Sequence, residues 1–174
     1  MESGARVLGH SIHPILIVFP LGLLSTGVVF DFIHLLGGGP TFTLVAYWMI
    51  MSGLVGGMLA AIFGWVDWFV IPSNSRAKKV GLLHGIVNAI VLLLYAASLY
   101  FRYNDPSRPE IIATVFSTIG AGFALVGGWL GGELVERLGV AVHTGAHVDA
   151  PSSLSVTRIP SEPLGGRATA TARR

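Results

Sequence analysis

The sequence predicts an all-α integral membrane protein, a bundle of four transmembrane helices. Of the 174 residues, 52% are hydrophobic and only 11% are charged, and the mean hydropathy is +0.70. The apolar residues form four long runs separated by short polar breaks. Soluble domains carry about a quarter charged residues, and about 20 consecutive apolar residues span the hydrocarbon core as a helix. A soluble protein is disfavoured because these runs exceed the usual length of core helices.

The first element is a polar lead over residues 1–12, followed by a predicted span over residues 13–36. Pro14 suits the first turn of a helix, where its missing N–H has no intrahelical partner. Pro20 lies inside the span, removes a backbone hydrogen bond and is expected to bend the helix. The span is too long for the apolar core of a secretory signal, so we expect it to remain as a membrane helix.

Three further spans follow, predicted over residues 43–71, 80–101 and 110–138. Gly- and Pro-rich or charged breaks separate them, which is typical of turns between helices. The expected transmembrane domain covers residues 13–142. From residue 143 to residue 174 the composition shifts to Ser, Thr, Ala, Gly, Pro and Arg without a sustained hydrophobic period. Such a composition predicts a disordered tail.

The distribution of Lys and Arg predicts the orientation. Four spans place the N-terminus, the loop between the second and third spans, and the C-terminus on one side. The basic residues of that side are Arg6, Arg76, Lys78, Lys79 and Arg137 near the spans, and Arg158, Arg167, Arg173 and Arg174 in the tail. The other side has only Arg102 and Arg108. The positive-inside rule therefore places both termini in the cytoplasm.

Small residues recur at four-residue spacing in two of the spans. The second span has Gly53, Gly57 and Ala61; the fourth has Gly120, Ala124, Gly128 and Gly132. Because lipid gives helices no hydrophobic reason to associate, close packing through small residues must supply the attraction. We expect these two spans to pack against each other or against another membrane subunit or a second copy of the chain, with lipid around them.

Polar and ionisable side chains gather at one end of the predicted bundle. Such groups in membrane helices are costly and are candidates for function. They are His10, His13, Asp67, His84, Asn88 and Glu133. The topology places all of them on the predicted cytoplasmic side, and His84 and Asn88 share a helix face at four-residue spacing.

Three kinds of chemistry suit this group. Histidine and carboxylate ligands suit a divalent metal, with candidate ligands His10, His13, Asp67, His84 and Glu133. Two histidines on facing helices suit the axial positions of haem b, with His13, His84 and Asn88 as the cofactor-binding residues. A proton relay is the third option, since histidine titrates near neutral pH.

Each of these residues also has an ordinary structural interpretation. His13 can be a helix-start residue in the headgroup region, and His84 with Asn88 can form an interhelical hydrogen bond. Asp67 can face water at a helix end, Glu133 can pair with Arg137 at i, i+4, and His10 can be exposed to solvent.

At the opposite end, Asp31 and His34 lie near a loop that contains Arg102. We interpret these residues as an ordinary polar helix end.

Several functions are disfavoured by what the sequence lacks. There is no cysteine, and no phosphate-binding loop, dinucleotide fingerprint, zinc-protease motif or serine-hydrolase motif is present. No charged residue lies at the middle of a span, which argues against an ion-coupled transporter with a midplane site. No basic patch with interleaved aromatic residues suggests nucleic-acid binding. No catalytic residue is assigned.

Four motifs stand out along the chain: Gly9-His10-Ser11-Ile12-His13-Pro14 with Phe19-Pro20, then Gly64-Trp65-Val66-Asp67-Trp68, then His84-Gly85-Ile86-Val87-Asn88, then Gly131-Gly132-Glu133-Leu134-Val135 with Gly139-Val140. Together they resemble the domain-of-unknown-function 2231 family of predicted bacterial membrane proteins. The resemblance covers residues 9 to 142. Each motif alone is weak, and the set is moderately specific.

The resemblance implies a small four-helix protein of the bacterial inner membrane, in a family sometimes fused to or adjoining redox modules such as Rieske-type domains. It implies no reaction. The family pattern has histidine before glycine after the basic residue that follows Glu133, whereas this chain has Leu138 before Gly139. This departure removes one candidate ligand, so a bis-histidine haem requires His13 and His84 as the pair.

The leading hypothesis is therefore an accessory, non-catalytic protein that binds haem or a metal and serves a redox or respiratory assembly. The alternative is a purely structural subunit whose polar groups join helices and whose small residues pack against partner chains. A small permease is the third and weakest option.

Overall fold

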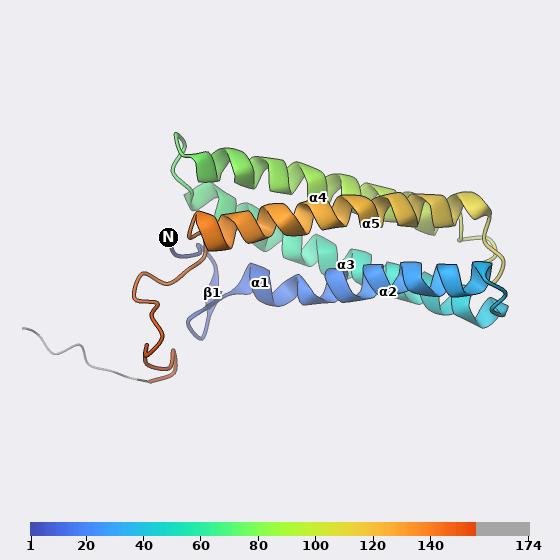
Figure 1. The fold of residues 1–174 in the computed structure, drawn as a ribbon, viewed down its shortest axis with the longest axis horizontal. Coiled ribbons are helices and arrows are strands. Elements are labelled where there is room, and N and C mark those ends of the chain that lie inside the picture. Colours follow the sequence, from blue (N-terminus) through green and yellow to red (C-terminus); the bar gives the residue numbers. More distant parts are fainter. Residues whose placement is uncertain (156–174) are drawn as a thin grey trace, which may run out of the picture.

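The computed structural model describes residues 1–155. A two-stranded antiparallel hairpin precedes a series of helices that lie side by side along one long axis (Figure 1). The elements are β1 Arg6–Val7, β2 His10–Ser11, α1 Ile12–Leu16, α2 Val18–Leu35, α3 Pro40–Val70, α4 Arg76–Tyr100, α5 Ile111–Gly132 and the π-helical turn η1 Glu133–Arg137. The fold is thus helical, apart from a small hairpin that the all-α prediction did not include.

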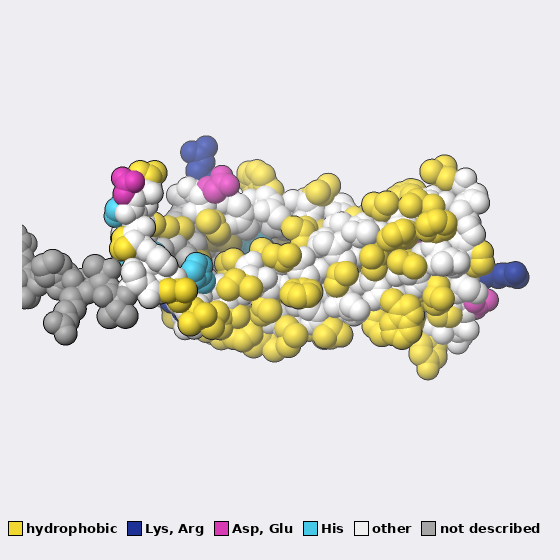
Figure 2. All heavy atoms as spheres, turned by 90° about the horizontal axis from the view of Figure 1, so that it is seen from below, with side chains coloured by type: hydrophobic (Ala, Val, Ile, Leu, Met, Phe, Trp, Pro, Cys, Tyr) yellow, Lys and Arg dark blue, Asp and Glu magenta, His cyan; other side chains and the backbone are white. Residues whose placement is uncertain are grey.

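Four helical stretches are long and apolar enough to cross a membrane. They are Ile12–Leu35, Pro40–Val70, Arg76–Tyr100 and Ile111–Arg137. On the face that Figure 2 shows, apolar side chains are spread along the length of the bundle and charged side chains lie towards its two ends. The four predicted helices are therefore present. The prediction of a disordered tail falls mainly on residues beyond 155, outside the described part of the chain.

The first span is divided in the way that its prolines predict. The α-helical pattern is interrupted at Ile17, between α1 and α2. Pro20 has no N–H to donate to the carbonyl of Leu16, so the ladder loses one bond at this point. The bonds on either side remain, since the Ile17 N–H donates to the His13 oxygen and the Leu21 N–H donates to the Ile17 oxygen, both at 3.1 Å.

Two of the helices begin earlier than predicted because local residues start them. Pro40 occupies the first turn of α3, where no N–H is needed. Ser75 caps α4 by accepting a hydrogen bond from the Lys78 N–H at 3.1 Å. The basic residues Arg76, Lys78 and Lys79 therefore belong to the first turn of α4 and not to the preceding loop.

The helices form an up-and-down bundle in which α2 and α4 lie diagonally opposite, as do α3 and α5. The neighbouring pairs are α2 with α3, α3 with α4, α4 with α5, and α2 with α5. The prediction that the second and fourth spans pack directly against each other is therefore wrong within one chain. Gly53 of α3 instead receives Leu24 of α2, and Gly120 of α5 receives Tyr95 of α4.

The N-terminus, the α3–α4 loop and η1 lie at one end of the bundle, and the other two helix–helix loops lie at the opposite end (Figure 1). This is the arrangement that four spans require. The placement of that end in the cytoplasm remains a prediction from the Lys and Arg distribution.

Candidate functional site

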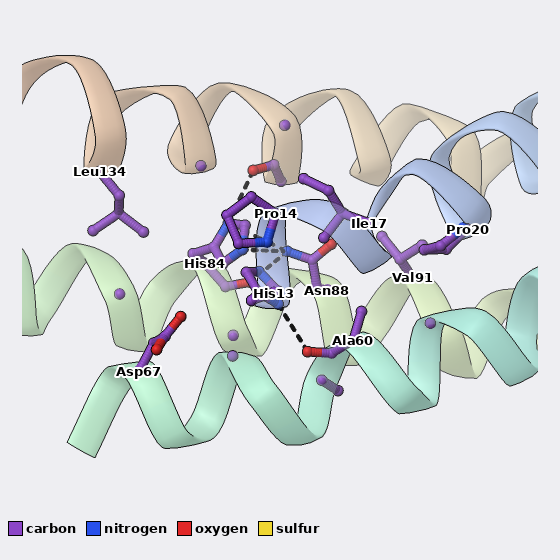
Figure 3. A pocket seen from close by; sticks show the side chains of 18 of the residues that line it. His13, Pro14, Ile17, Pro20, Ala60, Asp67, His84, Asn88, Val91 and Leu134 are labelled. Carbon is purple, nitrogen blue, oxygen red and sulfur yellow. Dashed lines mark hydrogen bonds between the residues drawn. The ribbon is translucent and has the colours of Figure 1, made fainter. Parts of the chain in front are cut away.

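A cavity of about 310 Å³ lies inside the bundle near the end that carries the N-terminus (Figure 3). All four spans line it, and its volume lies within the range of small-molecule sites, about 300–1,000 Å³. The walls are largely apolar, and glycine and alanine supply many of them. The polar lining side chains include those of His13, Asp67, His84 and Asn88.

His13 enters the cavity from α1 and hydrogen-bonds to α3. Its Nδ1 lies 2.8 Å from the backbone oxygen of Ala60. That oxygen is reachable because the residue one turn later is Gly64. A Cβ at Gly64 would lie 3.0 Å from His13 Cε1 and 3.1 Å from Nδ1. Gly64, the first residue of the Gly64-to-Trp68 motif, therefore leaves the space that the His13 ring occupies.

His84 of α4 repeats this arrangement against α5. Its Nδ1 lies 3.0 Å from the backbone oxygen of Gly127, and the residue one turn after Gly127 is Gly131. A Cβ at Gly131 would lie 3.2 Å from His84 Cε1. Both histidines thus bind a helix carbonyl exposed by a glycine four residues further along.

Asn88 lies one turn after His84 on the same face of α4. Its Nδ2 donates to the His84 backbone oxygen at 2.8 Å and lies 3.3 Å from both nitrogens of the His84 ring. The side chain rests against Gly127, where a Cβ would lie 3.1 Å from its amide atoms. Asn88 therefore helps to fix the position of the His84 ring.

The two histidine rings approach each other edge to face in the cavity. Their centres are 6.3 Å apart and their planes are nearly perpendicular, at 88°. A carbonyl oxygen only accepts hydrogen bonds, so each Nδ1 must carry the proton that it donates. In the neutral ring Nε2 then keeps its lone pair. This is the state in which histidine ligates metals, with the other nitrogen held by a carbonyl.

Asp67 also lines the cavity, on the side of the histidines towards the end of α3 (Figure 3). It is buried and binds the N-terminal lead: Ser3 Oγ and the Gly4 N–H both donate to its Oδ1, the latter at 2.9 Å. The interpretation of Asp67 as a water-facing helix end is therefore wrong. Its carboxylate holds residues 1–11 over this end of the bundle through these two hydrogen bonds.

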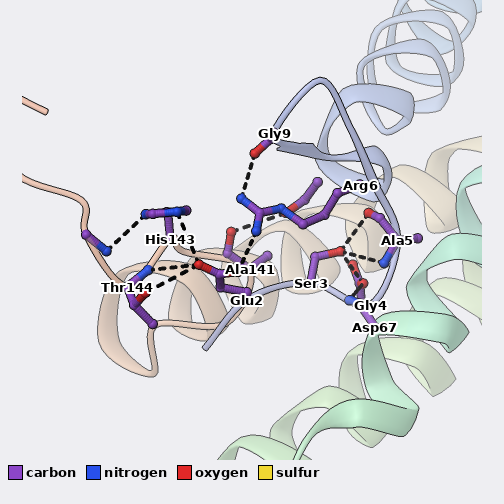
Figure 4. Close-up of polar contacts among 12 residues, drawn as sticks. Glu2, Ser3, Gly4, Ala5, Arg6, Gly9, Asp67, Ala141, His143 and Thr144 are labelled. Atoms are coloured by element: carbon purple, nitrogen blue, oxygen red, sulfur yellow. Dashed lines mark hydrogen bonds and ion pairs between the residues drawn. The ribbon is translucent and has the colours of Figure 1, made fainter. Parts of the chain in front are cut away.

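Further polar contacts hold the lead against the chain after η1 (Figure 4). The N-terminal amine donates to the Gly139 oxygen at 2.6 Å, and Ser11 Oγ donates to the Ala141 oxygen at 3.2 Å. Glu2 accepts from Arg6 at 2.5 Å and from the Thr144 N–H at 3.4 Å. The Thr144 N–H is the main cause that lowers the pKa of the Glu2 carboxyl.

The remaining predicted metal ligands do not join the histidine pair. His10 is exposed, with Nδ1 3.2 Å from the Leu8 oxygen. Glu133 pairs with Arg76 at 2.6 Å, so its predicted pairing with Arg137 is wrong. Among residues 1–155, no three His, Asp or Glu side chains are grouped so that they could hold a metal ion. The structure therefore brings together His13, His84 and Asn88 from the predicted set.

Replacing Asp67 with leucine is expected to release the N-terminal lead, because Ser3 and Gly4 lose their shared acceptor. Amide hydrogen exchange in residues 1–11 should accelerate about tenfold or more, as it does where a segment opens locally, while exchange in the middle of α4 stays unchanged. Replacing the exposed Glu136 with leucine serves as the control. Unchanged exchange in the lead of the Asp67→Leu variant would show that this carboxylate does not hold it.

The sequence reasoning missed a buried ionic network at the opposite end of the bundle. Asp31 and Arg102 are 1% and 0% exposed and form two parallel hydrogen bonds of 2.6 and 2.5 Å. Ser117 Oγ donates to Asp31 at 3.0 Å, and Arg102 Nε donates to Ser98 Oγ at 3.2 Å. The interpretation of Asp31 as an ordinary polar helix end is therefore wrong. The available signal was a pair of opposite charges at one end of the bundle, Asp31 near the end of the first span and Arg102 just after the third.

The fold and the cavity together define a small four-helix membrane bundle with a polar pair inside an apolar site. The family of predicted membrane proteins DUF2231 matches residues 9–144, and the chain belongs to this family. The resemblance seen in the motifs is thereby confirmed. No curated protein and no solved structure matches the chain.

Proposed function

We propose that the protein binds a metal cofactor, either haem or a divalent ion, within the membrane through His13 and His84. The observation that carries this proposal is that both rings make the same kind of hydrogen bond, each to a helix carbonyl. Each gives its Nδ1–H to a helix carbonyl, at 2.8 Å and 3.0 Å, which leaves Nε2 as the ligating atom. The 6.3 Å between ring centres accommodates one metal ion, since each metal–nitrogen bond takes about 2 Å.

The chemistry of the surroundings supports binding and not catalysis. Around the pair the cavity is largely apolar, and Asn88 contacts His84. Asp67, the nearby carboxylate, is engaged with the N-terminal lead. We further propose an accessory protein of a redox or respiratory assembly in a bacterial inner membrane, in line with the redox modules that adjoin some members of the resembled family; the distribution of Lys and Arg supports both termini in the cytoplasm.

A purely structural role is the second candidate, and one observation favours it. The His13 bond joins α1 to α3, and the His84 bond joins α4 to α5. Hydrogen bonds between membrane helices contribute about 0.6 kcal/mol each on average. In this role the two histidines stabilise the bundle and no cofactor is needed.

The two roles are separated by purifying the protein in mild detergent and measuring its absorption spectrum and metal content. We expect about one equivalent of haem or of a transition metal per chain, and its loss in the His13→Ala and His84→Ala variants. His34→Ala is the matched control, because the Nδ1 of His34 also contacts a carbonyl, that of Gly38 at 3.1 Å, at the other end of the bundle.

A preparation with neither haem nor metal, which also takes up neither haemin nor Zn²⁺ on addition, would overturn the cofactor proposal. Retention of cofactor by both the His13→Ala and His84→Ala variants would overturn the assignment of the ligands.

A further inference from the structure

The bundle consists of two equivalent helical hairpins, α1–α2–α3 and α4–α5. A shift of 71 residues relates the first helical arm of one hairpin, α1–α2, to the first helical arm of the other, α4. It relates His13 to His84, Leu24 to Tyr95, Gly27 to Ser98 and Asp31 to Arg102. All of these except the two histidines are buried, and each pair occupies the same position in its hairpin.

A shift of 67 residues relates the second arms, α3 and α5. It relates Ala46 to Ala113, Ile50 to Ser117, Gly53 to Gly120, Ala60 to Gly127 and Gly64 to Gly131. The contacts obey the same relation. Gly53 receives Leu24, and Gly120 receives Tyr95. The carbonyls that bind the two histidines, those of Ala60 and Gly127, are also equivalent.

Equivalent residues of the two hairpins meet each other along the length of the bundle. The His13 and His84 rings are 6.3 Å apart at one end. Tyr95 Oη donates to the Leu24 oxygen at 3.2 Å in the middle. Asp31 and Arg102 pair at the other end. In a two-fold arrangement only residues next to the axis contact their own equivalents. A pseudo-two-fold axis therefore runs along the bundle, as in parallel membrane repeats.

We propose that the cavity is a two-fold symmetric site for a metal tetrapyrrole, with the iron of haem on this axis between His13 and His84. This inference rests on the proposed cofactor binding and selects its chemical class. Each hairpin supplies one imidazole, one carbonyl that orients it and one glycine against which the ring lies, Gly64 or Gly131. Each hairpin would therefore contribute one imidazole to a metal held between the two rings, whose centres are 6.3 Å apart.

The number and charge of the ligands favour haem over a bare ion. Protein zinc sites use at least three protein ligands, whereas residues 1–155 provide no group of three His, Asp or Glu around the pair. Two neutral imidazoles would leave the double charge of a bare ion uncompensated among apolar walls, which is costly. A tetrapyrrole supplies four further nitrogens and two negative charges, and its apolar faces suit walls of glycine, alanine and leucine.

The test is titration of the detergent-solubilised apoprotein with haemin, followed by absorption and electron paramagnetic resonance spectroscopy. We expect one haem per chain with a low-spin spectrum of two imidazole ligands. Because each histidine is expected to supply one ligand, His13→Met and His84→Met should each convert it to a histidine–methionine spectrum. His34→Met should leave the spectrum unchanged.

Variants that fold poorly are distinguished from variants that lack a ligand by chemical rescue. Free imidazole should restore the low-spin spectrum of the His84→Gly and His13→Gly variants. One equivalent of Zn²⁺ or iron bound through the histidines without haem would overturn this inference and leave the proposed function intact. A haem whose spectrum responds to only one of the two histidines would overturn the symmetric site. Binding of neither haemin nor metal would overturn both.

Discussion

Replacing Arg102 with leucine is expected to destabilise the bundle by about 3–5 kcal/mol, because it leaves the Asp31 carboxylate buried without its countercharge. Asp31 and Arg102 are fully enclosed, and both carboxylate oxygens are bound by the guanidinium. The loss should appear as a lower midpoint in reversible unfolding by SDS in mixed micelles. Arg108→Leu, at an exposed arginine of the same end, is the control and should change the midpoint little.

A charge-swapped variant tests the same pair and the internal symmetry together. Asp31→Arg combined with Arg102→Asp should recover part of the stability lost in either single variant, because the two positions are equivalent across the axis. Recovery should be incomplete, since the hydroxyls of Ser98 and Ser117 favour the native polarity. An Arg102→Leu variant as stable as the Arg108→Leu control would mean that the pair contributes nothing to the fold.

The helices were predictable because their signal is local. Long apolar runs and proline positions are read directly from the sequence, and they placed four spans and the break near Pro20. The topology then placed His13, His84 and Asn88 at one end of the bundle, where they line one cavity. These inferences need only hydropathy, helix length and the fact that successive spans cross the membrane in opposite directions.

The partners of the polar residues were not predictable because they depend on tertiary contacts. Asp67 binds Ser3 and Gly4, more than sixty residues away, through a lead that folds back over the bundle. Arg102 follows the end of α4 at a position that hydropathy assigns to a loop, and only the packing of α2 and α5 around it buries the guanidinium.

The small residues were recognised, but their role was assigned to the wrong contact. Four-residue spacing of glycine indicates that something approaches the helix closely, and it does not identify what approaches. In this bundle Gly53 and Gly120 of the stripes receive the side chains of Leu24 and Tyr95, and the two imidazole rings lie against Gly64 and Gly131, which are outside the predicted stripes. The paired carbonyls at Ala60 and Gly127 add the hydrogen bond that the spacing alone does not reveal.

Replacing Gly131 with valine is therefore expected to lower the affinity for the cofactor 10- to 100-fold, the usual effect of disturbing the partners that orient a metal ligand. A Cβ there would already lie 3.2 Å from His84 Cε1, and the two methyl groups of valine must displace the ring from the Gly127 carbonyl. The neighbouring Gly132 is the matched control, because nothing lies within 4 Å of a Cβ at that position. Titration of both apoproteins with haemin measures the difference. Equal affinities for Gly131→Val and Gly132→Val would show that Gly131 does not help to position His84. By the pseudo-two-fold relation, Gly64→Val should reproduce the loss through His13.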